Sequence, residues 1–268
     1  MRTPLLVALA APLTLAACEP PPMTASEQVE AVQLSVETAR MDAATGDVIE
    51  ISTHFTLGQA AADAVDELKA FWESQAPCAT VTKEAGAVTV DFGTTDGCSW
   101  NGNTWTGQTR VELVAVGEGE AVVEHTWTDL SNSIGTVNGG ATVTWSAAEA
   151  SRRVEVDATW EGPDHTLDVS SDRTIALIEP GVLGSGIVID GSRTWTVDGT
   201  ATWEQTIDGV EMRAIDPAPQ AGSYTLVNPM SRQLVLSFDR VDEDTIRITA
   251  EARRTRTWLV TRAGVEEE

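Results

Sequence analysis

The chain is poor in positive charge, and in lysine above all. Of its 268 residues, 17 are lysine or arginine and 41 are aspartate or glutamate, and lysine occurs only at Lys69 and Lys83. Nucleic acids and anionic head groups are bound through lysine and arginine contacts to phosphate. The composition therefore argues against a nucleic-acid partner. So many acids would suit a divalent cation or a basic partner, or would serve solubility alone.

The chain also lacks a hydrophobic run that could span a bilayer. The apolar-rich stretch from Leu5 to Ala17 is shorter than the roughly twenty residues that a span needs, and it contains Pro12. It follows Arg2 and ends in Leu15-Ala16-Ala17-Cys18. This arrangement resembles a bacterial lipoprotein signal with its lipobox. The alternative is an ordinary secretory signal that leaves a free thiol.

The lipobox resemblance implies that residues 1–17 are removed and that Cys18 is lipidated, which would anchor the protein to a membrane. Because Glu19 rather than aspartate follows, we expect the outer membrane. Cleavage would remove one arginine and no acid, so the mature chain would carry a net charge of −25. Residues 18–27 contain three consecutive prolines and predict a solvated tether. Residues 28–262 then form a single domain, and residues 263–268 form an acidic tail.

Cysteine is scarce. Beside Cys18 only Cys78 and Cys98 remain, an even number for an oxidising compartment, so we expect them to form a disulfide. The alternatives are metal ligation and thiol catalysis. Both are poorly supported, because there is no Cys-x-x-Cys and no histidine nearby in the sequence.

Recognisable catalytic motifs are missing as well. His54, His125 and His165 are far apart in the sequence and lack metal-ligand spacing, and no Gly-x-Ser-x-Gly motif occurs. Asp242-Glu243-Asp244 lies between two strand-like runs and predicts an acidic hairpin tip rather than a calcium loop. We therefore expect no enzyme, no cofactor and no metal site. A hydrolase built on two of the 41 acids is a third possibility.

The N-terminal part of the domain has a helical pattern. Val29, Val32 and Val36 are roughly in phase, and Leu57, Ala61, Val65, Leu68 and Trp72 more clearly so. The second helix should end before Pro77. The stretch from Val48 to Phe55 fits either a helix continuation or a short strand.

From Cys78 onward, alternating threonine, valine and tryptophan with Asn-Gly, Asp-Gly and Gly-Gly turns predict consecutive β-hairpins. Seven of the nine tryptophans follow a threonine, which should place the indoles on a dry face of the sheet and the hydroxyls on a wet face. The Thr-Trp pairs end at Trp105, Trp127, Trp145, Trp160, Trp195, Trp203 and Trp258. Their irregular spacing predicts a meander rather than a repeat array.

The hairpin Arg193–Trp203 predicts a particular turn. A three-residue loop, Val197-Asp198-Gly199, with a glycine bulge would put Trp195 and Trp203 on the same face, whereas a two-residue Asp-Gly turn would put them on opposite faces.

The indoles have two possible roles. Trp105, Trp127, Trp195 and Trp203 could line a groove for a hydrophobic ligand, or they could fill the core between sheet and helices. Filling the core is the more common use of tryptophan.

Two stretches carry a further resemblance. Cys78-Ala-Thr-Val-Thr with Val88-Thr-Val-Asp-Phe-Gly93, and Gly222-Ser-Tyr-Thr-Leu with Thr245-Ile-Arg-Ile-Thr249, resemble a pattern common in uncharacterised Gram-negative surface or periplasmic lipoproteins. The resemblance implies location and a β-rich fold, and no activity.

The expected fold is mainly β (α+β), with N-terminal helices packed on a large antiparallel sheet that is open-barrel or sandwich-like. The expected function is a non-enzymatic, lipid-anchored envelope protein with a structural or partner-binding role. The alternative is a periplasmic carrier of lipid or another hydrophobic ligand in a half-barrel.

Overall fold

The computed structural model describes residues 20–54, 61–94, 96–117, 119–146, 148–180, 182, 185–213 and 215–268. The predicted signal peptide, the lipidation site Cys18 and the helix position Leu57 lie outside these residues.

The chain forms two helices followed by one large sheet, as the sequence predicted. The helices are α1 (Ala25–His54) and α2 (Ala61–Gln75). The strands are β1 (Thr80–Glu84), β2 (Ala87–Asp91), β3 (Cys98–Trp100), β4 (Asn103–Gly117), β5 (Glu120–Asn132), β6 (Gly135–Ser146), β7 (Ser151–Glu161), β8 (Thr166–Leu177), β9 (Ile187–Val197), β10 (Ala201–Met212), β11 (Ala221–Val227), β12 (Gln233–Arg240), β13 (Ile246–Glu251), β14 (Arg256–Thr261) and β15 (Gly264–Glu267).

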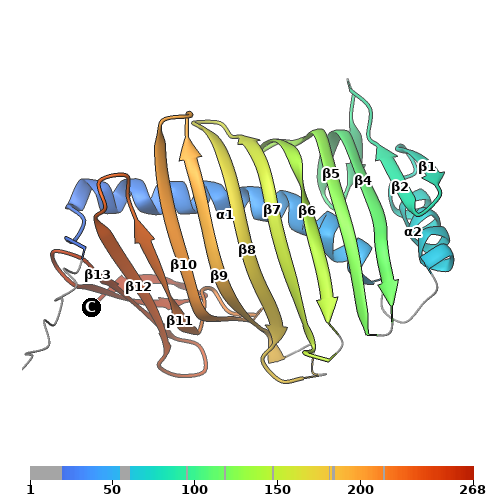
Figure 1. Ribbon diagram of the computed structural model, residues 1–268. Coiled ribbons are helices and arrows are strands. Elements are labelled where there is room, and N and C mark those ends of the chain that lie inside the picture. Colours follow the sequence, from blue (N-terminus) through green and yellow to red (C-terminus); the bar gives the residue numbers. More distant parts are fainter. Residues whose placement is uncertain are drawn as a thin grey trace, which may run out of the picture.

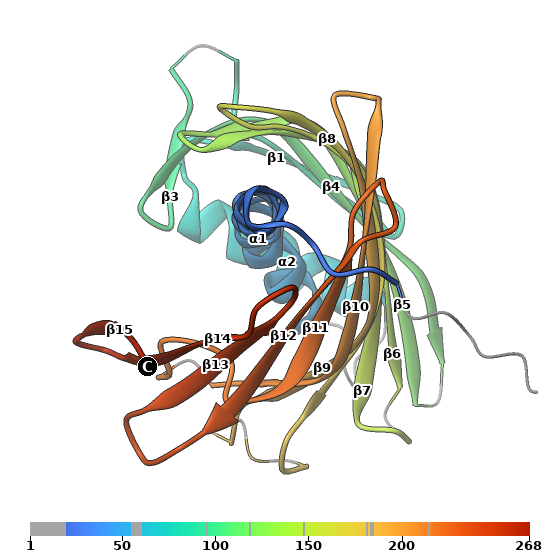
Figure 2. The same ribbon diagram turned by 90° about the vertical axis from the view of Figure 1, so that its left-hand side faces the viewer.

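The sheet is an antiparallel meander. Its 15 strands follow the chain order, except that β3 pairs only with β4 at one side. The sheet curls around α1, which crosses the strands on its concave face (Figures 1 and 2). Because β1 and β15 do not pair with each other, the sheet is an open barrel and not a sandwich. The expected mainly β fold with helices packed on an antiparallel sheet is confirmed.

The alternation of the Thr-Trp pairs also holds in the structure. Trp105, Trp127, Trp160, Trp195 and Trp203 are buried on the concave side, whereas Trp145 and Trp258 are partly exposed. The preceding threonines are exposed or partly exposed, because neighbouring residues of a strand point to opposite faces. The sheet therefore has the predicted dry and wet faces.

The Trp195–Trp203 hairpin confirms the shared face and corrects the loop. The two residues pair directly across β9 and β10, and their rings stack with centroids 6.4 Å apart. The three loop residues are 198–200, one position later than predicted, because Val197 still pairs with Ala201. Asp198 and Gly199 both have positive φ, so the chain reverses within residues 198–200 rather than within the predicted loop of residues 197–199.

Helix α1 continues to His54, which resolves the uncertain stretch after Val48 in favour of helix up to that residue. One face of α1 packs against the sheet, at the alternating three- and four-residue spacing of a helical stripe. This stripe contains Ala31, Leu34, Thr38, Met41 and Thr45, and α1 also buries Glu27, Glu37, Ala44 and Ile49. Val29 and Val32, which carried the helical pattern in the sequence, are exposed instead.

The start of α1 is hydrogen-bonded to the turn between β11 and β12, about 200 residues later in the chain. Glu27 caps the start of α1, because its carboxylate accepts hydrogen bonds from both the backbone N–H and the hydroxyl of Thr24 at 2.6 Å, the first of which is one half of a capping box. The same carboxylate accepts hydrogen bonds from Asn228 and Arg232, at 3.1 and 2.9 Å. These contacts lower the pKa of Glu27 to about 2, chiefly through the Thr24 hydrogen bonds.

Two predicted boundaries therefore shift. The tether was expected to reach residue 27, but Pro22 bridges to Gln233, Met23 is fully buried and α1 begins at Ala25. At the other end the predicted acidic tail is partly strand, because residues 264–267 pair with β14 as β15. Backbone pairing holds both segments despite their polar composition.

Helix α2 packs on β1, β2 and β4, at the end of the sheet shown at the right of Figure 1. Its buried Trp72 lies against Phe92 and Trp100, with ring centroids 5.9 and 4.8 Å apart. Next to this aromatic group the predicted disulfide joins Cys78 to Cys98, with Cα atoms 5.4 Å apart. Among the described residues, no helix combines the length and the apolar character needed to cross a membrane.

The disulfide closes a loop between residues 20 positions apart. Replacing both cysteines, Cys78→Ala with Cys98→Ala, should lower the free energy of unfolding by about 3 kcal/mol, because the unfolded chain regains the loop's conformational freedom. Urea unfolding followed by tryptophan fluorescence measures this change. Wild-type protein treated with a reductant should lose a similar amount, and an unchanged free energy of unfolding in both would contradict the stabilising role.

Candidate functional site

The structure does not gather the four predicted ligand-binding tryptophans into one site. Trp105 of β4 belongs to the aromatic group beside α2, whereas Trp195 of β9 and Trp203 of β10 lie five and six strands away. All four are at most 2% exposed, so they fill the core rather than line an open groove. The Trp105 indole donates to the Trp100 carbonyl at 3.2 Å. Within the described part of the chain, Nε1 of Trp127, Trp195 and Trp203 has no acceptor.

His125 lies on the same concave side, next to Trp127. Their ring centroids are 6.4 Å apart, and the His125 side chain is only 2% exposed. Burial lowers the pKa of His125 from 6.5 to about 4, because the imidazolium form would lose its hydration. His125 is therefore neutral at physiological pH.

The concave face is covered over only part of each central strand. Along β8, for example, Leu167, Val169 and Ser171 are buried, whereas Arg173 and Ile175 are partly exposed. The same change occurs on the neighbouring strands. Six of the inward-facing, partly exposed apolar residues are here called the open wall: Ile175, Ile189, Tyr224, Leu236, Ile248 and Trp258.

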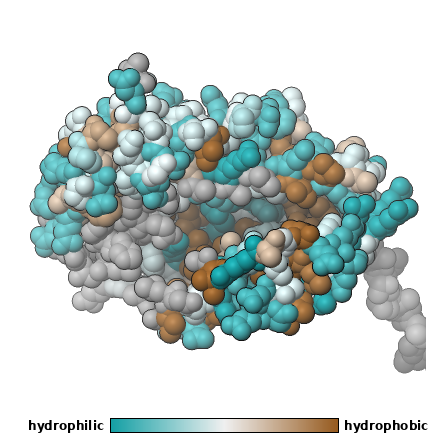
Figure 3. Space-filling model, turned by 180° about the vertical axis from the view of Figure 1, so that it is seen from behind, coloured by the Kyte–Doolittle hydropathy of each residue, from teal (hydrophilic) through white to brown (hydrophobic). Residues whose placement is uncertain are grey.

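The open wall extends across β8 to β14, and every strand of this stretch except β10 contributes one residue. Ile175 pairs with Ile189, Tyr224 pairs with Leu236, and Ile248 pairs with Trp258. Buried Val210 and Phe238 lie between these pairs on the same face. From this side the molecule is hollowed, and hydrophobic residues lie along the hollow (Figure 3). The concave face thus offers apolar surface that α1 leaves uncovered.

Charged residues stand where the covered part of the concave face meets the open wall. Asp42 of α1 accepts hydrogen bonds from Arg173 of β8, at 3.1 and 3.4 Å, and from Arg193 of β9. We call these three residues the arginine cluster. Burial lowers the pKa of Arg173, although Asp42 opposes this effect. The cluster fastens the middle of α1 to the sheet.

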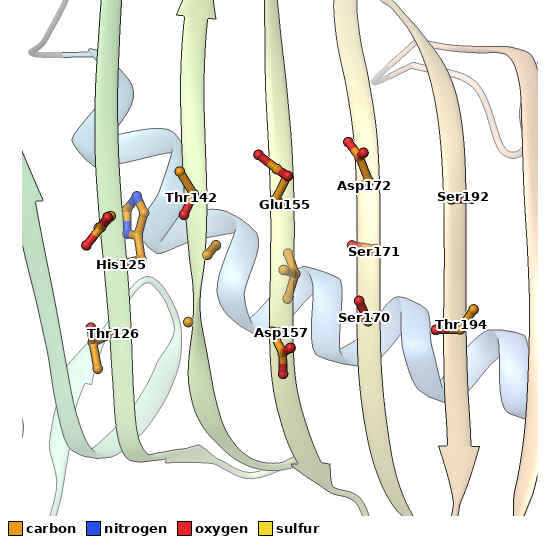
Figure 4. A pocket seen from close by; sticks show the side chains of 14 residues that line it. His125, Thr126, Thr142, Glu155, Asp157, Ser170, Ser171, Asp172, Ser192 and Thr194 are labelled. Carbon is orange, nitrogen blue, oxygen red and sulfur yellow. The ribbon is translucent and has the colours of Figure 1, made fainter. Parts of the chain in front are cut away.

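The convex face carries a second, different hollow. Carboxylates and hydroxyls of β5 to β9 line it, with Glu155, Asp157, Ser170 and Asp172 at its centre (Figure 4). Arg153 pairs with Asp172 through two hydrogen bonds of 2.8 and 2.6 Å and also contacts Glu155 at 3.0 Å. Part of this acidic surface is therefore neutralised within the protein itself.

The part of the chain that the structure describes contains no group of three or more histidine, cysteine, aspartate or glutamate side chains placed to hold a metal ion. The predicted acidic tip at residues 242–244 forms as a hairpin turn. In this turn the Asp242 carboxylate accepts backbone hydrogen bonds from Asp244 and Thr245. The Asp242 carboxylate therefore stabilises the turn by binding its backbone N–H groups.

Comparisons with protein-family models, with curated proteins and with solved structures gave no match.

The sequence reasoning missed the arginine cluster. The sequence did contain an indication of the cluster. Arg173 is an even number of residues from Leu167 and Val169, and Arg193 is two residues from Trp195, so both arginines fall on the dry face of their strands. A charged residue at a dry-face position indicates a specific partner. The partner, Asp42, could not be found in the same way, since it lies 131 and 151 residues away.

The buried His125 makes stability depend on pH. Because its pKa is about 4 in the folded protein and 6.5 in the unfolded chain, the unfolded chain binds the proton first as the pH falls. The free energy of unfolding should therefore fall between pH 6.5 and pH 4, by an amount on the order of 3 kcal/mol from this residue. Urea unfolding of wild type and His125→Gln at pH 7, 5.5 and 4 measures it. Parallel pH profiles for the two proteins would contradict this origin.

Proposed function

We propose that the chain is a non-enzymatic, lipid-anchored protein of the cell envelope that carries a hydrophobic ligand on the open wall. The observation behind this proposal is that six apolar residues, on six of the seven strands from β8 to β14, remain partly exposed on the concave side of a curled sheet. Contiguous exposed apolar surface in a soluble domain marks a binding site. Concave, mainly apolar surfaces with a few polar groups are typical of small-molecule sites.

The curvature of the sheet supports a ligand with a flexible apolar chain. Figure 2 shows the sheet curling around α1, so that β11 to β14 lie below the helix in this view. An acyl chain laid against Leu236 and Ile248 would bury apolar area on both partners, at about 25 cal/mol per Å².

A structural or protein-binding role without a small ligand is the second candidate. The specific observation in its favour is the complete burial of Trp105, Trp127, Trp195 and Trp203, which stabilise the fold and leave no groove among themselves. On this alternative, the open wall would be covered by another protein.

The lipid anchor is a separate part of the proposal, supported by the lipobox-like sequence before Cys18. Replacing this residue, Cys18→Ser, should move the protein from the membrane fraction to the soluble fraction, because no acyl chain can be attached. Fractionation after metabolic labelling with radioactive palmitate tests this expectation. Cys78→Ser is the matched control and should remain labelled. Label retained in Cys18→Ser would refute the anchor.

Ligand carriage can be tested by native mass spectrometry of protein purified from a bacterial envelope. Residues 1–18 are replaced by a cleavable secretion signal, so that the protein is exported without a lipid anchor. We expect an additional lipid-sized mass on the wild-type protein. The mass should be lost in Ile248→Glu, which places a charge on the open wall.

The matched control is Thr249→Glu, the next residue, which is also partly exposed but on the opposite face of β13. This variant should keep the additional mass. A clean mass of the polypeptide alone for the wild type would favour the structural or protein-binding role instead.

A further inference from the structure

The arginine cluster has more positive than negative charge. Arg173 and Arg193 share one carboxylate, that of Asp42. The Nε atoms of both arginines are buried and have no hydrogen-bond acceptor in the described part of the chain. The two buried Nε–H donors of the arginines therefore remain without an acceptor, although Asp42 accepts hydrogen bonds from other nitrogens of both side chains.

This excess is unusual because the rest of the protein is so acidic. The side chains of Arg193 and Arg173 are 6% and 13% exposed, so water solvates them little. A buried charge without a counter-charge is costly, and one carboxylate cannot neutralise two guanidinium groups. The site is chemically suited to a second anion.

The cluster is also reachable and continuous with the open wall. Asp42 is the most exposed of its three members, at 26%. Arg173 stands two residues before Ile175 on the same face of β8. Tyr224 of the open wall is close enough for its phenol to interact electrostatically with Arg193, Asp42 and Arg173, while burial raises the pKa of Tyr224.

We propose that the ligand of the open wall is an anionic amphiphile, with its acyl chain on the apolar residues and its carboxylate or phosphate head group on Arg173 and Arg193. This inference rests on the proposed carrier function and adds the chemical class of the ligand. The head group binds the arginines as a second anion beside Asp42, whose like charge competes with it for the two guanidinium groups. Guanidinium groups bind carboxylates and phosphates through paired, charge-assisted hydrogen bonds.

Two probes of equal chain length separate the head group from the chain. Oleate carries a carboxylate and oleyl alcohol does not, and their dissociation constants can be measured by competition with a fluorescent fatty-acid analogue on residues 19–268. We expect oleate to bind at least about tenfold more tightly than the alcohol. Asp42→Asn should increase the affinity for oleate by about tenfold, because the internal competitor is removed, and should leave the affinity for the alcohol unchanged.

The matched control is Glu30→Gln, which removes the same charge from an exposed position of the same helix. It should change neither affinity. A second variant, Arg173→Gln, keeps one arginine for Asp42, so it remains informative if Asp42→Asn does not fold. It should reduce the preference for oleate about tenfold and retain binding of the alcohol.

The outcomes distinguish the inference from the function on which it rests. If oleate and the alcohol bind equally, and neither variant changes their ratio, the anionic head group is wrong while hydrophobic carriage stands. If neither probe binds the wild-type protein, both the carrier function and the inference fail.

Discussion

The whole structure depends on covering the dry face of a long-stranded sheet with a single helix. Strands of 11 or 12 residues, such as β7 to β10, extend for about 40 Å, whereas a helix with its side chains is only about 10–12 Å wide. Because α1 crosses the strands, it covers one band of each. The curl of the sheet brings other strands near the part of the dry face that α1 does not cover. The open wall is the portion of that part that stays partly exposed.

Polar anchors, rather than apolar packing alone, fix the place where α1 lies. The helix has no strongly apolar face, since its buried stripe contains Thr38 and Thr45 and its valines at 29 and 32 are exposed. Glu27 fastens its start to the turn after β11, and Asp42 fastens its middle to β8 and β9. Ion pairs removed from water have a strict geometry, so they set the register of the helix on the sheet.

Charge is distributed unequally over the two faces of the sheet. The convex face presents carboxylates and hydroxyls to solvent, which suits a protein with 41 acidic residues. The concave side instead holds neutral His125, the buried carboxylate of Glu37 and the two arginines that share Asp42. The two arginines are the charged groups next to the open wall, and this local coincidence of apolar surface and excess positive charge is what points to an anionic amphiphile.

The sequence by itself determined the meander, the Cys78–Cys98 pair and the face on which each indole lies, because strand alternation and hairpin turns are local properties. It identified the Trp195–Trp203 pair but misplaced the loop by one residue, since positive φ at Asp198 was not evident from composition. Only the tertiary structure decided that the indoles fill the core, that part of the concave face stays open, and that Asp42 meets Arg173 and Arg193. Those features depend on the curl of the sheet and the path of α1, which arise from contacts between residues more than a hundred positions apart.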